Sequence, residues 1–141
     1  MAHTYNAADV SFIFGVVDTT EEPGDDTFIE VAYDEDLFAK KVGVKGTATR
    51  STSNNLGASI KVTCMYTSKV NSILMGIAIA DQKSGGGIQP ATLRDKGSKL
   101  ELHAMPQCWI KRKPDFSLAK QVGTIVWEFD CEAAVGMHGG R

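Results

Sequence analysis

Alternation of apolar and polar residues is clearest in Gly123-Thr124-Ile125-Val126-Trp127-Glu128-Phe129-Asp130-Cys131. Side chains of a β-strand point alternately to its two faces, so Ile125, Trp127 and Phe129 share one face. The opposite face carries Glu128 and Asp130. We expect the aromatic face to lie in a hydrophobic core and the acidic face to point away from it.

The same period of two recurs earlier in the chain. Ile60 and Val62 share a face with Cys64, and polar residues separate them. Further β-prone runs cover residues 10–17, 28–33, 100–105 and 108–112, and the segment 21–26 reads as a turn. Pro106 either separates the last two runs or marks a β-bulge. The chain is therefore expected to be mainly β.

One segment changes period. Val70, Ile73, Leu74 and Ile77 are spaced i, i+3, i+4 and i+7, which predicts an α-helix with one apolar stripe. The glycines at 85–87 end it. With no repeat and no long linker, residues 1–141 are expected to form a single domain. The predicted core residues are Ile60, Val62, Ile73, Leu74, Ile125, Trp127 and Phe129.

Composition excludes several classes of function. Seventeen acidic residues against fifteen basic ones give a net charge of −2, which argues against nucleic-acid binding through bulk positive charge. No stretch reaches the ~20 apolar residues of a bilayer span, and no secretory signal is visible. We expect no membrane binding and a chain made and kept in a cytoplasm. Three cysteines without a CxxC pair are expected to be buried, reduced thiols.

Candidate catalytic and cofactor motifs are weak. The glycine run 84–88 lacks the Gly-Lys-Ser/Thr ending of a phosphate loop and follows the predicted helix. His103 and Cys108 could be two metal ligands, but no second close pair completes a site. The acidic stretches lie in turn-like segments. We therefore expect no catalytic residue, no metal and no cofactor, and a protein that is not an enzyme.

A long, polar, β-prone arm spans Asp34–Ser53 and has few residues that could anchor it to a core. Isolated polar β segments are marginal in water, so this arm is expected to pair with a neighbouring subunit. It would carry contacts between subunits. Its candidate contact residues are Asp34, Glu35, Asp36, Lys40, Lys41, Gly43, Lys45 and Gly46.

Three segments in order carry a family resemblance. They are Tyr33–Asp36 leading into Gly43–Gly46, the run Gly57–Thr63 followed by Ser68–Leu74, and the closing Gly123–Cys131. They resemble an acidic pair before a Gly-x-x-Gly hairpin, a strand followed by Ser-x-x-Asn and a helix, and a final Trp-x-Phe strand. Together they resemble the tail tube protein family of contractile-tailed bacteriophages, over about residues 9–134.

The resemblance implies two packed antiparallel sheets with one flanking α-helix. It implies six subunits per ring, an inner β-barrel, and rings stacked into a tube. The implied partners are other copies of the chain, the tail sheath, the tape measure, the baseplate and the tail terminator, with DNA in transit through the lumen. The implied location is the virion tail, assembled in the host cytoplasm.

Passage of DNA would favour an acidic lumen, since tight phosphate contacts would stall it. The lumen-facing candidates are Glu30, Glu101, Glu128 and Asp130. Alternatively, these carboxylates pair with Lys61, Lys99 or Arg50 and leave a neutral wall. Two other functions stay open: the tube of a type VI secretion or bacteriocin-like injection system, and a small β-barrel module that binds a ligand.

Overall fold

A computed structural model describes residues 2, 4–20, 28–96 and 102–137. This part of the chain is mainly β, with one eight-stranded antiparallel sheet, one two-stranded hairpin and one α-helix. The central path of the large sheet runs in the order β2-β1-β7-β8-β9-β6-β3, and β10 pairs with β8. Its strands are β1 (Val10–Phe14), β2 (Val17–Asp18), β3 (Ile29–Tyr33), β6 (Ala58–Met65), β7 (Gln89–Asp95), β8 (Leu102–Arg112), β9 (Thr124–Cys131) and β10 (Val135–Met137). A short 3-10 helix, Ala7–Asp9, precedes β1.

The large sheet folds over on itself through β8. The first half of β8 pairs with β7 and its second half pairs with β9. Met105 lies opposite Ala91 and Cys108 lies opposite Gln89, so β8 holds one extra residue around Pro106. Such a bulge bends a strand, which lets β8 belong to both halves of the sheet. Pro106 therefore marks a bulge inside one continuous strand.

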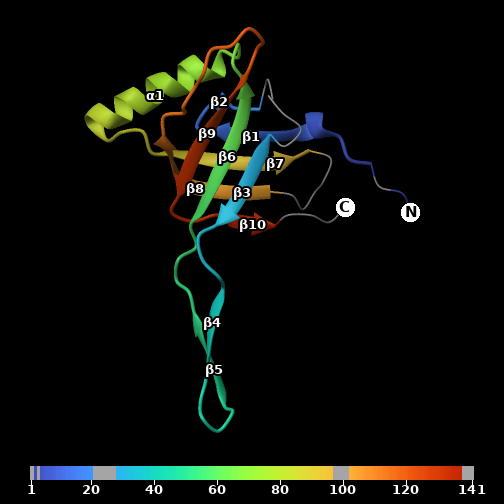
Figure 1. Ribbon diagram of the computed structural model, residues 1–141, viewed down its shortest axis with the longest axis vertical. Coiled ribbons are helices and arrows are strands. Elements are labelled where there is room, and N and C mark those ends of the chain that lie inside the picture. Colours follow the sequence, from blue (N-terminus) through green and yellow to red (C-terminus); the bar gives the residue numbers. More distant parts are fainter. Residues whose placement is uncertain (1, 3, 21–27, 97–101, 138–141) are drawn as a thin grey trace.

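The two halves of the sheet face each other across the core. β1 and β9 are not hydrogen-bonded neighbours, yet the rings of Phe12 and Phe129 have centroids 5.3 Å apart. The thiol of Cys64 on β6 donates to the carbonyl of Thr19, just after β2, at 3.3 Å. In Figure 1 the strands β1, β7 and β8 run across the direction of β9, β6 and β3. The two packed layers expected from the sequence are thus halves of one folded sheet.

The core fills the space between these layers. Among the residues predicted to form it, Ile60, Val62, Leu74, Ile125, Trp127 and Phe129 are buried. The indole N–H of Trp127 donates to Oδ1 of Asn71 at 3.0 Å, which joins β9 to the helix. A buried tryptophan needs such a partner for its one polar group.

The helix α1 (Val70–Ser84) packs through Val70 and Leu74, both fully or nearly fully buried. The prediction that Ile73 lies in the core is wrong, because 45% of its surface is exposed. Successive helical residues are about 100° apart, so Ile73 is turned away from the side that Leu74 buries. Gly85, with φ of 71°, ends the helix in the left-handed conformation.

All three cysteines are free and buried, as predicted. Burial raises the pKa of Cys64 to about 11 and that of Cys108 to about 12. The pKa of Cys131 is raised chiefly by burial, to which the charges of Asp34 and Asp130 add. These thiols act as small apolar side chains.

The second sheet is a hairpin of β4 (Phe38–Val42) and β5 (Ala48–Thr52), which projects away from the body of the molecule (Figure 1). The Gly43 N–H donates to the Thr47 carbonyl at 2.8 Å, and the Gly46 N–H donates to the Gly43 carbonyl at 2.9 Å. Gly46 has φ of 87°, which suits glycine at this turn. The predicted turn at 21–26, and Lys99 and Glu101, lie outside the described residues.

Candidate functional site

The projecting hairpin is exposed at every residue of β4 and β5. Between Leu37 and Ser53 the sequence holds four cations and no carboxylate. Because the whole chain has a net charge of −2, the rest of the chain carries −6. The molecule is therefore an acidic body with a basic hairpin. The four cations are Lys40, Lys41, Lys45 and Arg50.

One face of the hairpin concentrates this charge. Lys40 lies directly opposite Arg50 in the strand register. The guanidinium carbon of Arg50 is 4.1 Å from the centre of the Phe38 ring, on the same face. Within the described residues, none of the four cations forms an ion pair. Like charges placed directly opposite each other destabilise a strand pair, so this face would be stabilised by an anionic partner.

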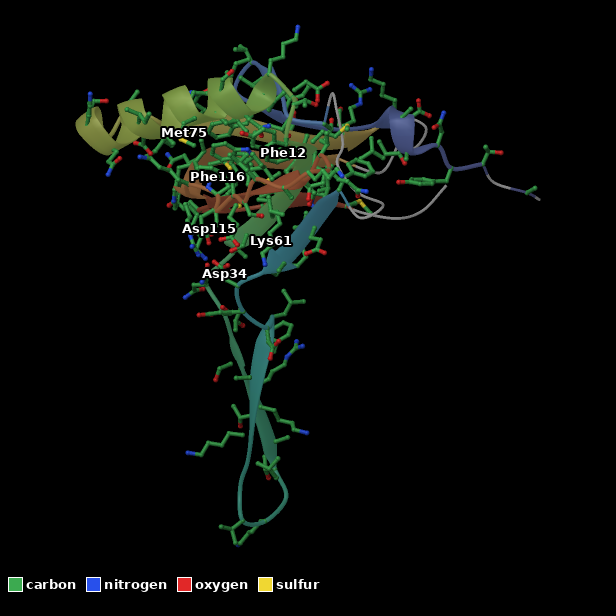
Figure 2. All side chains as sticks on the ribbon, turned by 45° about the horizontal axis from the view of Figure 1, so that its top comes forward. Phe12, Asp34, Lys61, Met75, Asp115 and Phe116 are labelled. Carbon is green, nitrogen blue, oxygen red and sulfur yellow. The ribbon has the colours of Figure 1, made fainter. Side chains whose placement is uncertain are left out.

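The hairpin joins the body at an acidic base, where Figure 2 labels Asp34. Asp34, Glu35 and Asp36 are all exposed. The Ser53 hydroxyl donates to Oε2 of Glu35 at 2.6 Å, which ties the two ends of the hairpin together. A side chain at position 57 would meet the Asp34 carboxylate, so a glycine there leaves room for that carboxylate.

Beside this base lies an open hollow of about 520 Å³, which we call the root hollow. Its lining mixes three carboxylates with one lysine, several neutral polar side chains and the ring of a half-buried tryptophan. The Ser59 hydroxyl donates to Oδ1 of Asp130 at 2.9 Å and holds that carboxylate in place. The root hollow is lined by Asp34, Asn55, Ser59, Gln107, Trp109, Lys111, Asp130, Cys131 and Glu132.

The lumen candidates Glu30, Glu128 and Asp130 lie on one outer face of the β3-β6-β9 layer. Lys61 on β6 is the register partner of both Glu30 on β3 and Glu128 on β9. Its Nζ is 3.9 Å from Oε1 of Glu128 (Figure 2 labels Lys61). Arg112 on β8 lies opposite Glu128 on the other side. Charges of alternating sign therefore run across the four strands. Among the predicted pairings of these carboxylates with nearby cations, the pairing with Lys61 is observed for Glu128.

Catalytic and metal chemistry find little support in this geometry. Among the described residues, no three His, Cys, Asp or Glu side chains are grouped as a metal site. His103 and Cys108, the pair weighed as ligands, both lie on β8 and are both buried. The part of the chain that is described holds no helix with the length and hydropathy of a bilayer span.

The predicted contact residues fall into two separate groups. Lys40, Lys41, Gly43, Lys45 and Gly46 lie on the hairpin, whereas Asp34, Glu35 and Asp36 lie at its base. Sequence reasoning missed the root hollow, because Trp109, Lys111 and Glu132 come from β8 and from the end of β9. Alternation along β9 indicated the orientation of Asp130, but nothing in the sequence paired β9 with β8 at this end.

Comparison with known proteins adds structural neighbours. No protein-family model matches the chain, and no curated protein matches it in sequence. The tube-terminating cap of the anti-feeding prophage has a similar structure, with a TM-score of 0.63 and 9% identity over 99% of this chain and 95% of the cap. The sheath/tube terminator of an extracellular contractile injection system, PVC, in its extended state has a TM-score of 0.62 and 9% identity, over 97% of this chain and 99% of the other.

Both neighbours are terminating or cap components of contractile injection systems. Nearly the whole of each chain is aligned, so the likeness includes the body and is not limited to a common motif. At 9% identity it is a likeness of fold. The chain thus shares its fold with structural proteins found at the ends of injection tubes.

Proposed function

We propose that this chain is a structural subunit of the tail tube of a contractile injection machine, such as a contractile phage tail. The observation that carries the proposal is the basic hairpin, which is exposed along its length and has no ion-pair partner among the described residues of its own chain. A second copy of the chain would cover it. Fold likeness to two tube-associated proteins and the tail-tube resemblance of the sequence support the same conclusion.

In this proposal copies of the chain close into rings of six, and the rings stack into a hollow tube. Ring closure through strand pairing would cover the free edges of β3 and β2 at the two ends of the sheet. The part of the outer face with Glu30, Lys61 and Glu128 is the candidate for the lumen wall, whereas Asp130, at the end of that face beside Asp34, is left to contacts between copies. The tube would surround the tape measure, lie within the sheath, and conduct DNA in a virion tail.

The hairpin would cross from one subunit to another. Each copy offers one hairpin and one receiving surface that differ in charge, so in this proposal the hairpin of each copy contacts the next copy and the contact is heterologous. Heterologous contacts generate closed rings or open-ended filaments, and a stacked tube is such an open assembly. The hairpin of the free monomer, which is exposed along its length, would become protected on assembly.

A second function is favoured by the fold comparison, because both neighbours are terminators or caps. In this alternative the chain forms one ring that ends a tube and does not continue it. Its hairpins would then contact the last ring of a different tube protein, and one face of the ring would stay unpaired with further copies.

Electron microscopy with light scattering on the purified chain tests the proposal. A tube subunit is expected to form rings and long tubes by itself, since it carries both halves of the stacking contact. A terminator is expected to stop at single rings and to cap preformed tubes. A strictly monomeric chain at high concentration, even with salt or a tail initiator, would contradict both functions.

A further inference from the structure

The root hollow lies at the junction of the hairpin and the body, about one hairpin length from the hairpin tip. Val44 at the turn comes eight positions after Asp36, and each position of a strand spans about 3.3 Å, so the hairpin is roughly 26 Å long. β6 also has eight residues and runs from the side of the hairpin base toward the opposite end of the body, where the segment between β8 and β9 extends beyond it (Figure 1). The hairpin is therefore about as long as the β3-β6-β9 layer, whose length we call the body height.

This match of lengths has a geometric consequence. If a second copy is placed below the first by one body height, the hairpin tip of the upper copy comes level with the root hollow of the lower copy. The tip of a rigid hairpin is too far from its own root hollow to reach it. The arrangement repeats without limit, because every copy has one tip and one root hollow.

The charges of the two surfaces are complementary. The basic face of the hairpin places Lys40 opposite Arg50, with Lys45 in the turn. The root hollow offers the carboxylates of Asp34, Asp130 and Glu132 against the single cation Lys111. Opposite charge on the two halves of a contact favours the correct pairing and disfavours contact between two hairpins.

The apolar parts of the two surfaces also fit. Val44 at the turn is fully exposed, and Phe38 and Val42 are 43% and 54% exposed on the basic face of the hairpin. The ring of Trp109 lines the root hollow and is half-buried. Apolar side chains within a charged rim are typical of protein contacts.

We infer that the hairpin tip of one copy docks in the root hollow of another copy, with Lys40, Lys45 and Arg50 against Asp34, Asp130 and Glu132. This inference rests on the proposed self-assembly and names its receiving surface. The tip would fill the hollow, while Lys40 and Arg50 would lie over its carboxylate rim. Contact between copies would then remove the like-charge repulsion within the hairpin face.

Charge exchange between the two surfaces tests the inference. We expect Lys40→Glu with Arg50→Glu to raise the critical concentration for assembly about tenfold or more, through loss of complementary charge. Asp34→Lys with Glu132→Lys, on exposed root residues, should have an effect of similar size. The chain with all four substitutions should assemble again, and so should an equal mixture of the two double variants.

Matched controls and a second measurement complete the test. The control for the hairpin variant is Lys69→Glu with Lys83→Glu at α1, which also replaces two cations with carboxylates. The control for the root variant is Asp115→Lys beyond β8, which also replaces a carboxylate with lysine. Both controls lie away from the proposed contact and should leave assembly unchanged. Circular dichroism checks that each variant is folded. In wild-type polymers, carbodiimide should join Lys40 or Lys45 to Asp34 or Glu132, and isotope-mixed chains should show that the link is between copies.

Three outcomes would overturn the inference: normal assembly of the root variant, no recovery by the fourfold variant, or cross-links from the hairpin only to other surfaces. The second and third would assign the hairpin to a different partner surface. A wild-type chain that never assembles would instead overturn the proposed function, so the two failures are distinguishable.

Discussion

The β6–β9 pair and the β4–β5 hairpin are both antiparallel strand pairs, yet they differ in almost every other respect. β6 and β9 alternate buried and outward-facing residues along their length, with Ile60, Val62, Trp127 and Phe129 in the core. In β4 and β5 every residue is exposed. The first pair is stabilised within its own chain by apolar burial. The second has its own ladder and turn, the contact of Arg50 with Phe38 and the hydrogen bond of Ser53 to Glu35, and it buries no residue, so we propose that further stabilising contacts come from another copy.

The body should respond most strongly to loss of its central aromatic side chain. Trp127→Ala is expected to lower the free energy of unfolding by about 3–5 kcal/mol, since it opens a cavity and removes the hydrogen bond to Asn71. Val126→Ala on the opposite face of β9, where Val126 is 41% exposed, is the matched control and should cost much less. Urea denaturation measures both. Equal losses would show that the register of β9 is wrong.

The two neighbouring residues of α1 sharpen the boundary of the core. Leu74→Ala should cost about 2–5 kcal/mol, as expected for a buried leucine. Ile73→Ala should change stability by only about 0.5 kcal/mol, because Ile73 is turned toward solvent. A large loss at Ile73 in the monomer would place it back in the core. A loss that appears only in the polymer would assign its exposed side chain to a contact between copies.

Raising the pH should weaken the body without involving the hairpin. The thiols of Cys64 and Cys108 keep their protons in the folded chain up to a pKa of about 11 and about 12, whereas the unfolded chain loses them near pH 9. Between these values the unfolded state binds fewer protons, so stability falls as pH rises. Thermal unfolding between pH 8 and pH 11 measures this. Cys64→Ala, which removes one such thiol, should flatten the pH dependence, and an unchanged slope would contradict the account.

Removal of the hairpin should separate stability from assembly. Replacing residues 38–52 with a short glycine-serine linker is expected to shift the melting temperature by only a few degrees, because no core residue is lost. The same chain should form no stacked polymer. Calorimetry and light scattering report the two effects. A deletion variant that unfolds would show that the hairpin supports its own body.

The sequence was informative where a strand or helix has one buried side. The alternation in residues 125–129 indicated which side chains of β9 face the core, and Gly85 indicated the end of α1. Ile73 was wrongly predicted to lie in the core with Leu74. The spacing of apolar residues along α1 does not show which edge of the apolar stripe faces the core. The fold-over of the sheet at Pro106 could not be read from the sequence, since a bulge depends on the facing strand.

The candidate site could also be predicted only in part from the sequence. The segment 34–53 stood out as polar and β-prone, and its cations and carboxylates were visible in order along the chain. Their separation into a basic hairpin and an acidic base is visible in this order, and the pairing of Lys40 with Arg50 is local to the hairpin. The position of Asp34 beside Asp130 and Glu132 joins distant parts of the chain and leaves no local sequence signal.

Hydrogen exchange on the free subunit and on the assembled polymer tests the central claim most directly, because it reports each segment within the intact chain. The account predicts fast exchange for the amides of β4 and β5 in the monomer and strong protection of the same amides in the polymer. The amides of β6 and β9 should be protected in both states and serve as the internal reference. Equally strong protection of the hairpin in monomer and polymer would show that it belongs to the fold of its own subunit, and the account would be wrong.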